Sequence, residues 1–485
     1  MIGNLIVFLC AAGLAVPATL AAMRLAGRIG AVDQPGLRKV HSRPMPRTGG
    51  LGILIPTIVV LAAGLLVKRE MGQSLAGNLP GAVALLGGAV VLFAVGLVDD
   101  IRGLRARHKL LAQLVCAAGL CACGVRIELL AAEGLFYISM GWLSWPVTIL
   151  WVVGVTNAMN LIDGLDGLAS GIAAIACAVI AIFCLCTGQA LMAMLMFSLL
   201  GSLCGFLLFG FNPARIFLGD CGSLFIGYLL AGGSVLSSTK TMTAVGMALP
   251  LLAMGVPIFD TLFCMIRRAL ERRSPFSPDR GHIHHRLLAM GLRHRHVVLM
   301  LYGMTLLSAG LGMFMMVTRN AGTLLVFLGV LTLLGLAFYG LGAVPVRDAI
   351  GKLRRNLAIS RACKSNREAF EHGQLMLREA RNAGQPWDAL CHTAGRLGVR
   401  ALRLVRGGQV VCSWRHQEHG LSCAAAVHVS FPCDCTVQAG SAAFEIDIDA
   451  SGGLELAGHR AAVFGRLAEQ CHLAETQELL VKQAA

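Results

Sequence analysis

Long apolar stretches recur along the first 345 residues of the chain and are separated by short polar connections. A helix needs about 17–25 predominantly apolar residues to cross a bilayer, and eleven stretches come close to that length or reach it. We therefore predict an all-α polytopic membrane domain over residues 1–345. The predicted transmembrane helices are 2–23, 50–67, 79–98, 110–126, 142–159, 169–187, 189–210, 223–238, 243–266, 297–317 and 322–343.

The pattern changes near Val346, where charged residues become frequent. Residues 346–383 are predicted to form a charged helical linker, and residues 384–485 a small α+β domain. The elements expected in this domain are strands at 399–411, 424–431 and 443–448, a helix at 459–481, and turns at Gly407-Gly408 and Gly452-Gly453.

Composition excludes several classes of protein. Hydrophobic residues make up 56% of the 485 residues and charged residues 14%, against about 25% charged residues in an average soluble domain. A disordered chain and a soluble enzyme are therefore excluded. The net charge of +15 lies mainly between the apolar stretches, since residues 1–344 hold 24 Lys and Arg but only 12 Asp and Glu. A nucleic-acid-binding protein would carry this excess in its soluble part, so no nucleic-acid partner is expected.

Lys and Arg are unevenly divided between the connections. Those that follow odd-numbered helices carry 19, and those that follow even-numbered helices carry 5. Because cytoplasmic loops are enriched in Lys and Arg, we predict that the odd-numbered connections and the tail are cytoplasmic. The first apolar run lacks a basic leading region and a cleavage site, so we interpret it as a retained helix.

The acidic residues of the membrane domain gather on the same side. Nine of its twelve Asp and Glu lie in or beside the odd-numbered connections. Asp99 and Asp100 close the third predicted helix, where adjacent carboxylates repel each other unless a cation is near. Such oxygen-rich sites suit Mg²⁺ or Mn²⁺ better than zinc. Interfacial charges that reach water are the alternative, but a pair that opposes the helix dipole adds little stability.

Asn and Asp recur every third residue at the end of the fifth predicted helix. Asn157, Asn160 and Asp163 share one broad face of a helix, and the glycines that follow can end the helix and re-aim Asp166. These side chains can hydrogen-bond a base or a sugar and supply oxygen ligands to a metal. A polar seam between helices is the alternative.

An irregular loop joins the seventh and eighth predicted helices and contains Pro213, Phe217, Gly219 and Asp220. Irregular backbone at membrane depth is tolerated where it lines a cavity. Asp220 is therefore a further acidic site. Phe217 could stack on a planar base, although lipid or core contact would explain this residue equally well.

Two cationic loops lie on the predicted cytoplasmic side. Dense imidazole and guanidinium groups are typical of a phosphate site, whereas a zinc site would usually add cysteines at recognisable spacing. Lipid headgroups could account for the Arg and Lys of the first loop. The loops contain Arg38, Lys39, His41, Arg43 and Arg47, and Asp279, Arg280, His282, His284 and His285.

Together these motifs predict a pyrophosphate site with a divalent metal, for phosphoryl-type transfer to a lipid. In their order along the chain and their common side of the membrane, these motifs resemble those of the polyprenyl-phosphate N-acetylhexosamine-1-phosphate transferase family. This family includes phospho-N-acetylmuramoyl-pentapeptide-transferase. The resemblance covers roughly residues 1–345. It implies about ten or eleven helices in the inner membrane of a bacterial cell, a cytoplasmic active site, and Mg²⁺ or Mn²⁺ as cofactor.

The reaction that the resemblance implies is attack by polyprenyl phosphate on the sugar-linked phosphorus of a UDP-N-acetylhexosamine. UMP leaves, and the lipid-diphospho-sugar initiates a cell-envelope polysaccharide. Ile283 interrupts the His-His-His run of the muropeptide branch, so N-acetylglucosamine 1-phosphate is the favoured group. A homodimer is left open, and the tail is expected to be regulatory or scaffolding.

The resemblance also implies residue roles. Asp220 is the first metal-ligand candidate, followed by Asp100 and Asn160. Asp99 or Asp100 would position or deprotonate the lipid phosphate, and His282 and Asp220 complete the catalytic candidates. The substrate-binding candidates are Lys39, His41, Asn157, Asn160, Asp163, Asp166, Phe217, Arg280, His284 and His285.

Three alternatives remain open at this point. One is transfer of the phospho-MurNAc-pentapeptide within the same family. A transporter with a cytoplasmic regulatory domain would distribute its polar residues through the membrane midplane. An intramembrane aspartyl protease would need a Gly-x-Gly-Asp sequence, and Phe217 replaces the first glycine.

Overall fold

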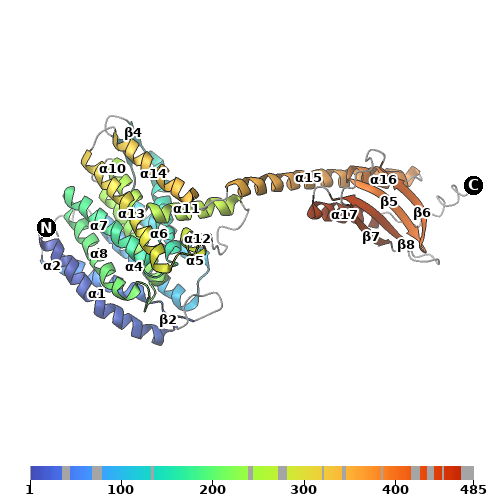
Figure 1. Cartoon of the computed structure of the whole chain (residues 1–485). Helices are drawn as coiled ribbons and strands as arrows, with labels where there is room; N and C mark the ends of the chain where they lie inside the picture. Colours follow the sequence, from blue (N-terminus) through green and yellow to red (C-terminus); the bar gives the residue numbers. More distant parts are fainter. Residues whose placement is uncertain are drawn as a thin grey trace, which may run out of the picture. The chain divides into compact units, whose positions relative to one another are not determined.

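The computed structural model divides the chain into two compact units, Met1–Val346 and Arg347–Ala485 (Figure 1). We refer to them as the membrane unit and the C-terminal unit, and each is described by itself. The described residues are 2–34, 44–67, 79–132, 136–238, 244–270, 281–318, 322–340, 346–383, 386–416, 426–433, 442–450 and 453–470.

Helices dominate the membrane unit, and each of the eleven predicted spans overlaps at least one of them. The helices are α1 (Ile2–Ile29), α2 (Gly49–Val67), α4 (Leu79–Arg102), α5 (Ala106–Ala122), α6 (Ser144–Ile162), α7 (Leu168–Cys186), α8 (Ala190–Gly210), α9 (Gly219–Ser238), α10 (Ala244–Ala253), α11 (Gly255–Leu270), α12 (Ile283–Ala289), α13 (His294–Thr318) and α14 (Gly322–Gly340).

Eight helices among the described residues are long and apolar enough to cross a membrane, which confirms a polytopic membrane protein. The predicted number of eleven is not reached, for three reasons. Helix α5 has only 17 residues and carries Lys109 near its start. The predicted span 243–266 is interrupted at Met254 and forms α10 and α11. The apolar helical segment described within α14, Leu325–Phe338, is too short to count as a membrane-spanning helix.

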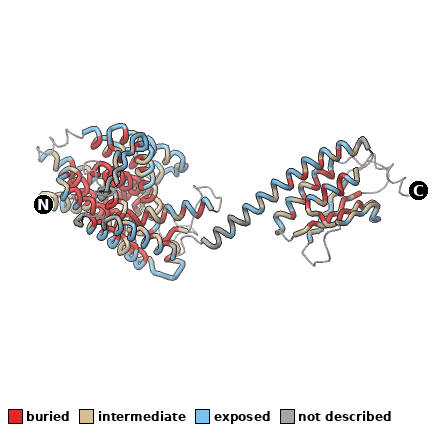
Figure 2. Tube along the Cα trace, turned by 90° about the horizontal axis from the view of Figure 1, so that it is seen from above, coloured by how far each residue is buried: buried red, intermediate tan, exposed pale blue. Residues whose placement is uncertain are grey.

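Helix α9 lies at the centre of the membrane unit and packs against α4, α6 and α2. Its apolar segment is entirely buried within the protein, whereas α1 exposes Leu5 and Ile6 on the outside (Figure 2). Helix α4 approaches α9 so closely that a Cβ atom at Gly96 would lie 2.5 Å from the Asp220 carbonyl oxygen. The beginning of α9 is therefore held firmly between its neighbours.

Two short ribbons interrupt the helical pattern, so the membrane unit is mostly helical but not all-α. Strands β1 (Val32–Asp33) and β2 (Met45–Pro46) pair antiparallel, as do β3 (Leu129–Ala132) and β4 (Phe136–Ser139). Both ribbons lie in connections between helices. Strand β2 binds the loop before α9, because the Phe217 N–H donates to the Pro46 carbonyl at 2.8 Å.

The C-terminal unit begins with the long helix α15 (Val346–Ala383) and contains a four-stranded antiparallel sheet of order β6-β5-β8-β7. One face of the sheet packs through Leu402, Phe444 and Ile446 against helices. The remaining elements are α16 (Pro386–Arg396), β5 (Val399–Arg406), β6 (Gln409–Arg415), β7 (Ala426–Cys433), β8 (Ala442–Asp449) and α17 (Leu454–Glu469).

The predicted elements of this unit need three corrections. The strand expected at 399–411 is a hairpin, β5 and β6, because Gly407 and Gly408 both adopt positive φ and reverse the chain. Helix α16 was not predicted. Helix α17 begins earlier than expected at Leu454, and residues 471–481 of the predicted helix lie outside the described residues.

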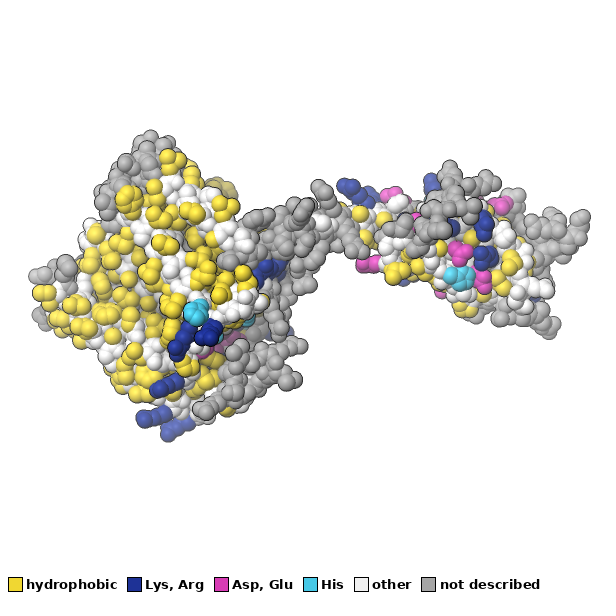
Figure 3. Space-filling view, in the orientation of Figure 1, with side chains coloured by type: hydrophobic (Ala, Val, Ile, Leu, Met, Phe, Trp, Pro, Cys, Tyr) yellow, Lys and Arg dark blue, Asp and Glu magenta, His cyan; other side chains and the backbone are white. Residues whose placement is uncertain are grey.

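Charged side chains cover the other face of the sheet. Asp447 pairs with Arg403 at 3.1 Å and with His428 at 2.8 Å, while Asp449 pairs with Arg400 at 2.5 Å. Figure 3 shows this mixture of charges on the C-terminal unit, in contrast to the mainly hydrophobic surface of the membrane unit. Asp447 and Asp449, together with Glu445, share one face of β8 and form ion pairs there.

Candidate functional site

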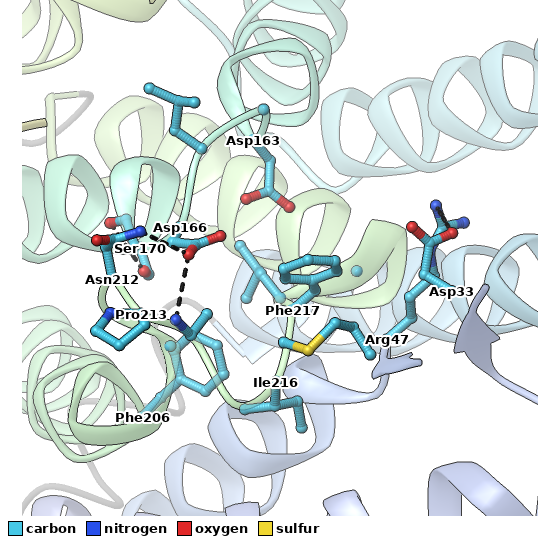
Figure 4. Close-up of a pocket in the computed structure, with 18 of the residues that line it drawn as sticks. Asp33, Arg47, Asp163, Asp166, Ser170, Phe206, Asn212, Pro213, Ile216 and Phe217 are labelled. Carbon is cyan, nitrogen blue, oxygen red and sulfur yellow. Dashed lines mark hydrogen bonds and ion pairs between the residues drawn. The ribbon is translucent and has the colours of Figure 1, made fainter. Parts of the chain in front are cut away.

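A cavity of about 650 Å³ lies where β1, β2 and the ends of α4, α6 and α8 meet the beginning of α9 (Figure 4). Among the described residues, five aspartates and a single basic Lys or Arg side chain, Arg47, line it. Six of the predicted site residues contribute to the lining. They are Asp100, Asp163, Asp166, Phe217, Asp220 and His285.

Lys109 of α5 joins two of the predicted catalytic carboxylates. Its Nζ atom lies 2.8 Å from Asp99 Oδ2 and 2.7 Å from Asp220 Oδ2. One ammonium group thus offsets the repulsion between carboxylates that come from α4 and α9. Asp99 also accepts a hydrogen bond from the Leu104 N–H, which fixes the turn between α4 and α5. Asp99 itself does not line the cavity.

Asp100 binds the beginning of α9. Its two carboxylate oxygens accept hydrogen bonds from the N–H groups of Asp220 and Cys221, each at 3.0 Å. These are among the N–H groups that a helix leaves without intrahelical partners, and the helix dipole favours a negative charge there. Asp100 therefore holds α9 and the Asp220 side chain in a fixed position.

Asp163 faces an excess of negative charge. Burial raises the pKa of its carboxyl well above the usual value, and Asp220, Asp100 and Asp166 raise it further, while Arg47 lowers it. A divalent cation would relieve this repulsion, and carboxylate oxygens are the ligands that Mg²⁺ prefers. The donor set therefore fits Mg²⁺, although among the described residues no three His, Cys, Asp or Glu side chains already form a metal cluster.

Asp166 ties together three segments of the chain. Its Oδ2 atom accepts hydrogen bonds from Asn212 Nδ2 at 3.0 Å and from the Ala214 N–H at 3.2 Å (Figure 4). Its own N–H donates to His294 Nε2 at 3.0 Å. The turn after α6 and the loop before α9 are thereby held against the beginning of α13. In the structure, Asp166 shapes the wall of the cavity.

Asn157 and Asn160 lie on the predicted face of α6 but do not line the cavity. Asn157 Nδ2 donates to Gln113 Oε1 of α5 at 2.6 Å. Asn160 Nδ2 donates to Ser223 Oγ of α9 at 2.8 Å. Both amides therefore link α6 to its neighbours. Helix α6 ends at Ile162, so Asp163 lies just beyond the helix on whose face it was predicted. Gly167, one of the glycines expected to end the helix, turns the chain with a φ of +79°.

The three predicted histidines of the second cationic loop have different environments. His282 Nδ1 donates to Asp260 Oδ2 at 2.8 Å, and Asp260 Oδ1 also accepts the Ile283 N–H at 2.8 Å. Burial and the neighbouring His285 lower the pKa of His284 to about 3, so its imidazole is neutral. His285 lines the cavity, whereas His282 and His284 lie behind it.

Three predicted site residues lie outside the described residues, namely Lys39, His41 and Arg280. Their proposed contacts with phosphate groups stay predictions.

Known proteins resemble this chain in the same region. A profile of glycosyl transferase family 4 matches residues 82–238. The probable undecaprenyl-phosphate N-acetylglucosaminyl 1-phosphate transferase of Bacillus subtilis (strain 168) is 43% identical over 281 residues, or 58% of this chain and 75% of the relative. This chain belongs to glycosyl transferase family 4.

Other relatives of this family 4 protein differ in the sugar that their names specify. The decaprenyl-phosphate N-acetylglucosaminephosphotransferase of Mycobacterium tuberculosis (strain ATCC 25618 / H37Rv) is 35% identical over 345 residues, or 64% of this chain and 82% of the relative. The phospho-N-acetylmuramoyl-pentapeptide-transferase of Synechococcus sp. (strain JA-3-3Ab) is 36% identical over 248 residues, or 48% of this chain and 70% of the relative. The resemblance inferred from the motifs is confirmed.

Sequence reasoning missed several residues that shape the cavity of this family 4 protein. Lys109 was counted only as a positive charge in a connection, although a lysine at the beginning of an apolar helix, ten residues after Asp99, was a usable signal. Arg47 was expected only as one of several cations in the first loop, and its pairing with Asp33 at 2.7 Å, both on the cavity, was not predicted. His294 gave no signal, because nothing near it in the sequence indicates its contact with Asp166.

The Asp260–His282 pair should make the stability of this family 4 protein depend on pH. Burial alone would lower the pKa of His282, but hydrogen bonds to Asp260 and Cys264 raise it to about 9, above the unfolded value of about 6.5. The stabilisation is thus complete below about pH 6.5 and is lost as the pH rises through about 9. We expect the Tm to fall across this interval by more in the wild type than in His282→Gln, measured by thermal unfolding in detergent. Parallel curves for the two proteins would contradict the assignment.

Proposed function

We propose that this chain transfers N-acetylglucosamine 1-phosphate from UDP-N-acetylglucosamine to polyprenyl phosphate. The observation that best supports this proposal is a cavity in the membrane unit that five aspartates line. One of them, Asp100, is hydrogen-bonded to the beginning of α9. The relatives from Bacillus subtilis and Mycobacterium tuberculosis, of which the match covers three quarters or more, are named for this transfer. Their names also supply the class of lipid acceptor.

The reaction exchanges one phosphoanhydride bond for another. An oxygen of the lipid phosphate attacks the phosphorus linked to the sugar, and the bond from that phosphorus to the UMP oxygen breaks. The products are UMP and a polyprenyl-diphospho-N-acetylglucosamine. Asp99 or Asp100 is the group we assign to the lipid phosphate, of which Asp100 lines the cavity, and Phe217 is assigned to the uracil ring.

Mg²⁺ is the cofactor that we propose, with Asp220 and Asp163 as the first candidates to hold it. When bound, it would neutralise the charges of the pyrophosphate and the leaving phosphate. Asp100 accepts two backbone hydrogen bonds and orients Asp220. Lys109 keeps Asp220 and Asp99 at a fixed separation, so that both carboxylates are in place before substrate arrives.

We expect EDTA to abolish turnover by the purified protein, because the crowded carboxylates cannot receive a pyrophosphate without a cation. Mg²⁺ or Mn²⁺ added in excess should restore it. The measurement is UMP release in detergent, with an unchanged Tm in EDTA as the control for folding. Undiminished turnover in excess EDTA would remove the metal from the proposal.

An exchange assay tests the substrate. The purified protein is given undecaprenyl phosphate together with UDP-GlcNAc, UDP-GalNAc or UDP-MurNAc-pentapeptide, and lipid-linked product is measured. We expect product from UDP-GlcNAc. Product from the pentapeptide substrate alone would assign the muropeptide reaction, as in the Synechococcus relative. Solute transport without UMP release would overturn the proposal altogether.

We also propose that the cavity and the C-terminal unit lie on the cytoplasmic side of a bacterial inner membrane, as the distribution of Lys and Arg indicates. The lining residues that the structure describes all belong to the membrane unit. A chain that ends at Arg354 should therefore insert and retain transferase activity, measured by UMP release. A well-folded truncation without activity would show that the C-terminal unit completes the active site.

A further inference from the structure

A second cavity, of about 560 Å³, lies within the C-terminal unit between α16 and the end of β6. Its volume falls in the range of small-molecule sites, and no residue of the proposed reaction contributes to it. The residues that line it are Trp387, Asp388, Cys391, His392, Gly395, Arg396, Trp414 and His416.

Two tryptophans form part of its wall. The chain has five tryptophans, and the two that lie outside the membrane unit, Trp387 and Trp414, meet at this cavity although 27 positions separate them. Each is half-buried and packs on one side against the core of the unit. The Trp414 ring is also held by His416, whose ring lies 5.8 Å away at an angle of 86°. Such fixed, partly exposed indole rings provide stacking surfaces for a planar ligand.

Helix α16 contributes two parallel rows of side chains at spacings of four residues. Trp387, Cys391 and Gly395 form one row. Asp388, His392 and Arg396 form the other, and all three are exposed. This second row places a carboxylate and a guanidinium about 12 Å apart along the helix. The helix dipole alone would favour an acid at the beginning and a base at the end, but it does not explain why the same cavity is also lined by two tryptophans.

Gly395 leaves the floor of the cavity open. A Cβ atom at this position would lie 3.3 Å from His416 Cδ2 and 3.5 Å from Trp414 Cη2. Any longer side chain would therefore extend from α16 toward the rings of Trp414 and His416. Gly395 thus keeps a hollow beside the two aromatic rings.

We propose that this cavity binds a nucleoside monophosphate. The base stacks on an indole ring, the phosphate binds Arg396 through charge-assisted hydrogen bonds, and the N–H edge of the base donates to Asp388. The row of Asp388, His392 and Arg396 matches such a ligand in length and polarity. Asp388 offers a hydrogen-bond acceptor at one end, and Arg396 offers a cation at the other. The C-terminal unit is then a nucleotide-binding module attached to a membrane transferase.

The test is isothermal titration of the full-length protein in detergent with AMP, GMP, CMP and UMP. We expect at least one nucleotide to bind, and Gly395→Leu to abolish that binding because the leucine fills the hollow. The matched control is Gly458→Leu on α17, where a Cβ atom would meet nothing within 4 Å. This control should bind the nucleotide as the wild type does.

A second pair of variants tests the phosphate contact without altering the core. Arg396→Ala should weaken binding of the monophosphate by about 10-fold or more, but should leave binding of the parent nucleoside nearly unchanged. Arg466→Ala, which removes an exposed arginine from the last turn of α17, should have no effect. Absence of binding by all four nucleotides would overturn the proposal. Equal binding by Gly395→Leu and Gly458→Leu would also overturn the proposal. UMP that binds equally to both variants would be bound at the cavity of the membrane unit.

Discussion

Asp220→Asn is expected to lower kcat by at least about 100-fold and to leave the Tm unchanged. The asparagine keeps the size of the side chain, and Lys109 retains Asp99 as a partner at 2.8 Å, so α4, α5 and α9 should stay together. What is lost is a negative charge at the beginning of α9, directly on the cavity. That charge is the first candidate for binding the metal that neutralises the departing phosphate. UMP release and thermal unfolding of the purified variant are the measurements.

A matched control for this variant is Asp447→Asn. This aspartate also pairs with two basic side chains, Arg403 and His428, but it lies on the sheet of the C-terminal unit. It should retain the kcat of the wild type. Turnover near the wild-type level in Asp220→Asn would show that the cavity does not use this carboxylate.

The convergence of the acidic motifs could be predicted from sequence because the membrane restricts where charges lie. Once the apolar stretches are placed, the ends of alternate helices must share one side of the bilayer. Asp100, Asp163 and Asp220 follow from this argument, and the structure brings all three to one cavity. The sequence could not separate lining residues from supporting ones. Asn160 and Asp163 are three positions apart, yet Asn160 binds Ser223 of α9 while Asp163 lines the cavity.

Contacts between distant segments account for most of what was missed in the site. The ion pair of Lys109 with Asp220 links residues 111 positions apart, and the contact of His294 with Asp166 spans 128 positions. Neither pairing follows from local spacing. His282 was placed in a cationic cluster by its sequence neighbours, and its contact with Asp260, 22 positions away, could not be read from that spacing. Its role in the reaction stays a prediction.

The C-terminal unit shows the limit of local patterns. The alternation of Glu445, Asp447 and Asp449 correctly placed them on one face of a strand. Helix α16 was missed because its eleven residues begin with Pro386 and include Gly395, and they present only a narrow apolar face. That omission also hid the second cavity, since α16 contributes six of the eight residues that line it.

Gly219→Ala is expected to reduce kcat by about 100-fold or more, because small displacements of reacting groups have effects of that size. Gly219 adopts a φ of +76°, and a Cβ atom there would lie 2.1 Å from the Arg47 carbonyl oxygen and 2.7 Å from Asp100 Oδ2. The backbone oxygen cannot rotate away. Relief of the clash must therefore move the beginning of α9 away from Asp100, and the Asp220 carboxylate moves with it.

Gly124→Ala separates this displacement from ordinary backbone strain. Gly124 has a similar φ of +85°, but a Cβ atom there would meet nothing within 4 Å. Both variants should lose about 1–2 kcal/mol of stability from the left-handed conformation, seen as a lower Tm. Only Gly219→Ala should also lose turnover in the UMP-release assay. Equal losses of kcat in the two variants would mean that strain, and not the position of Asp220 relative to Asp100, limits the reaction.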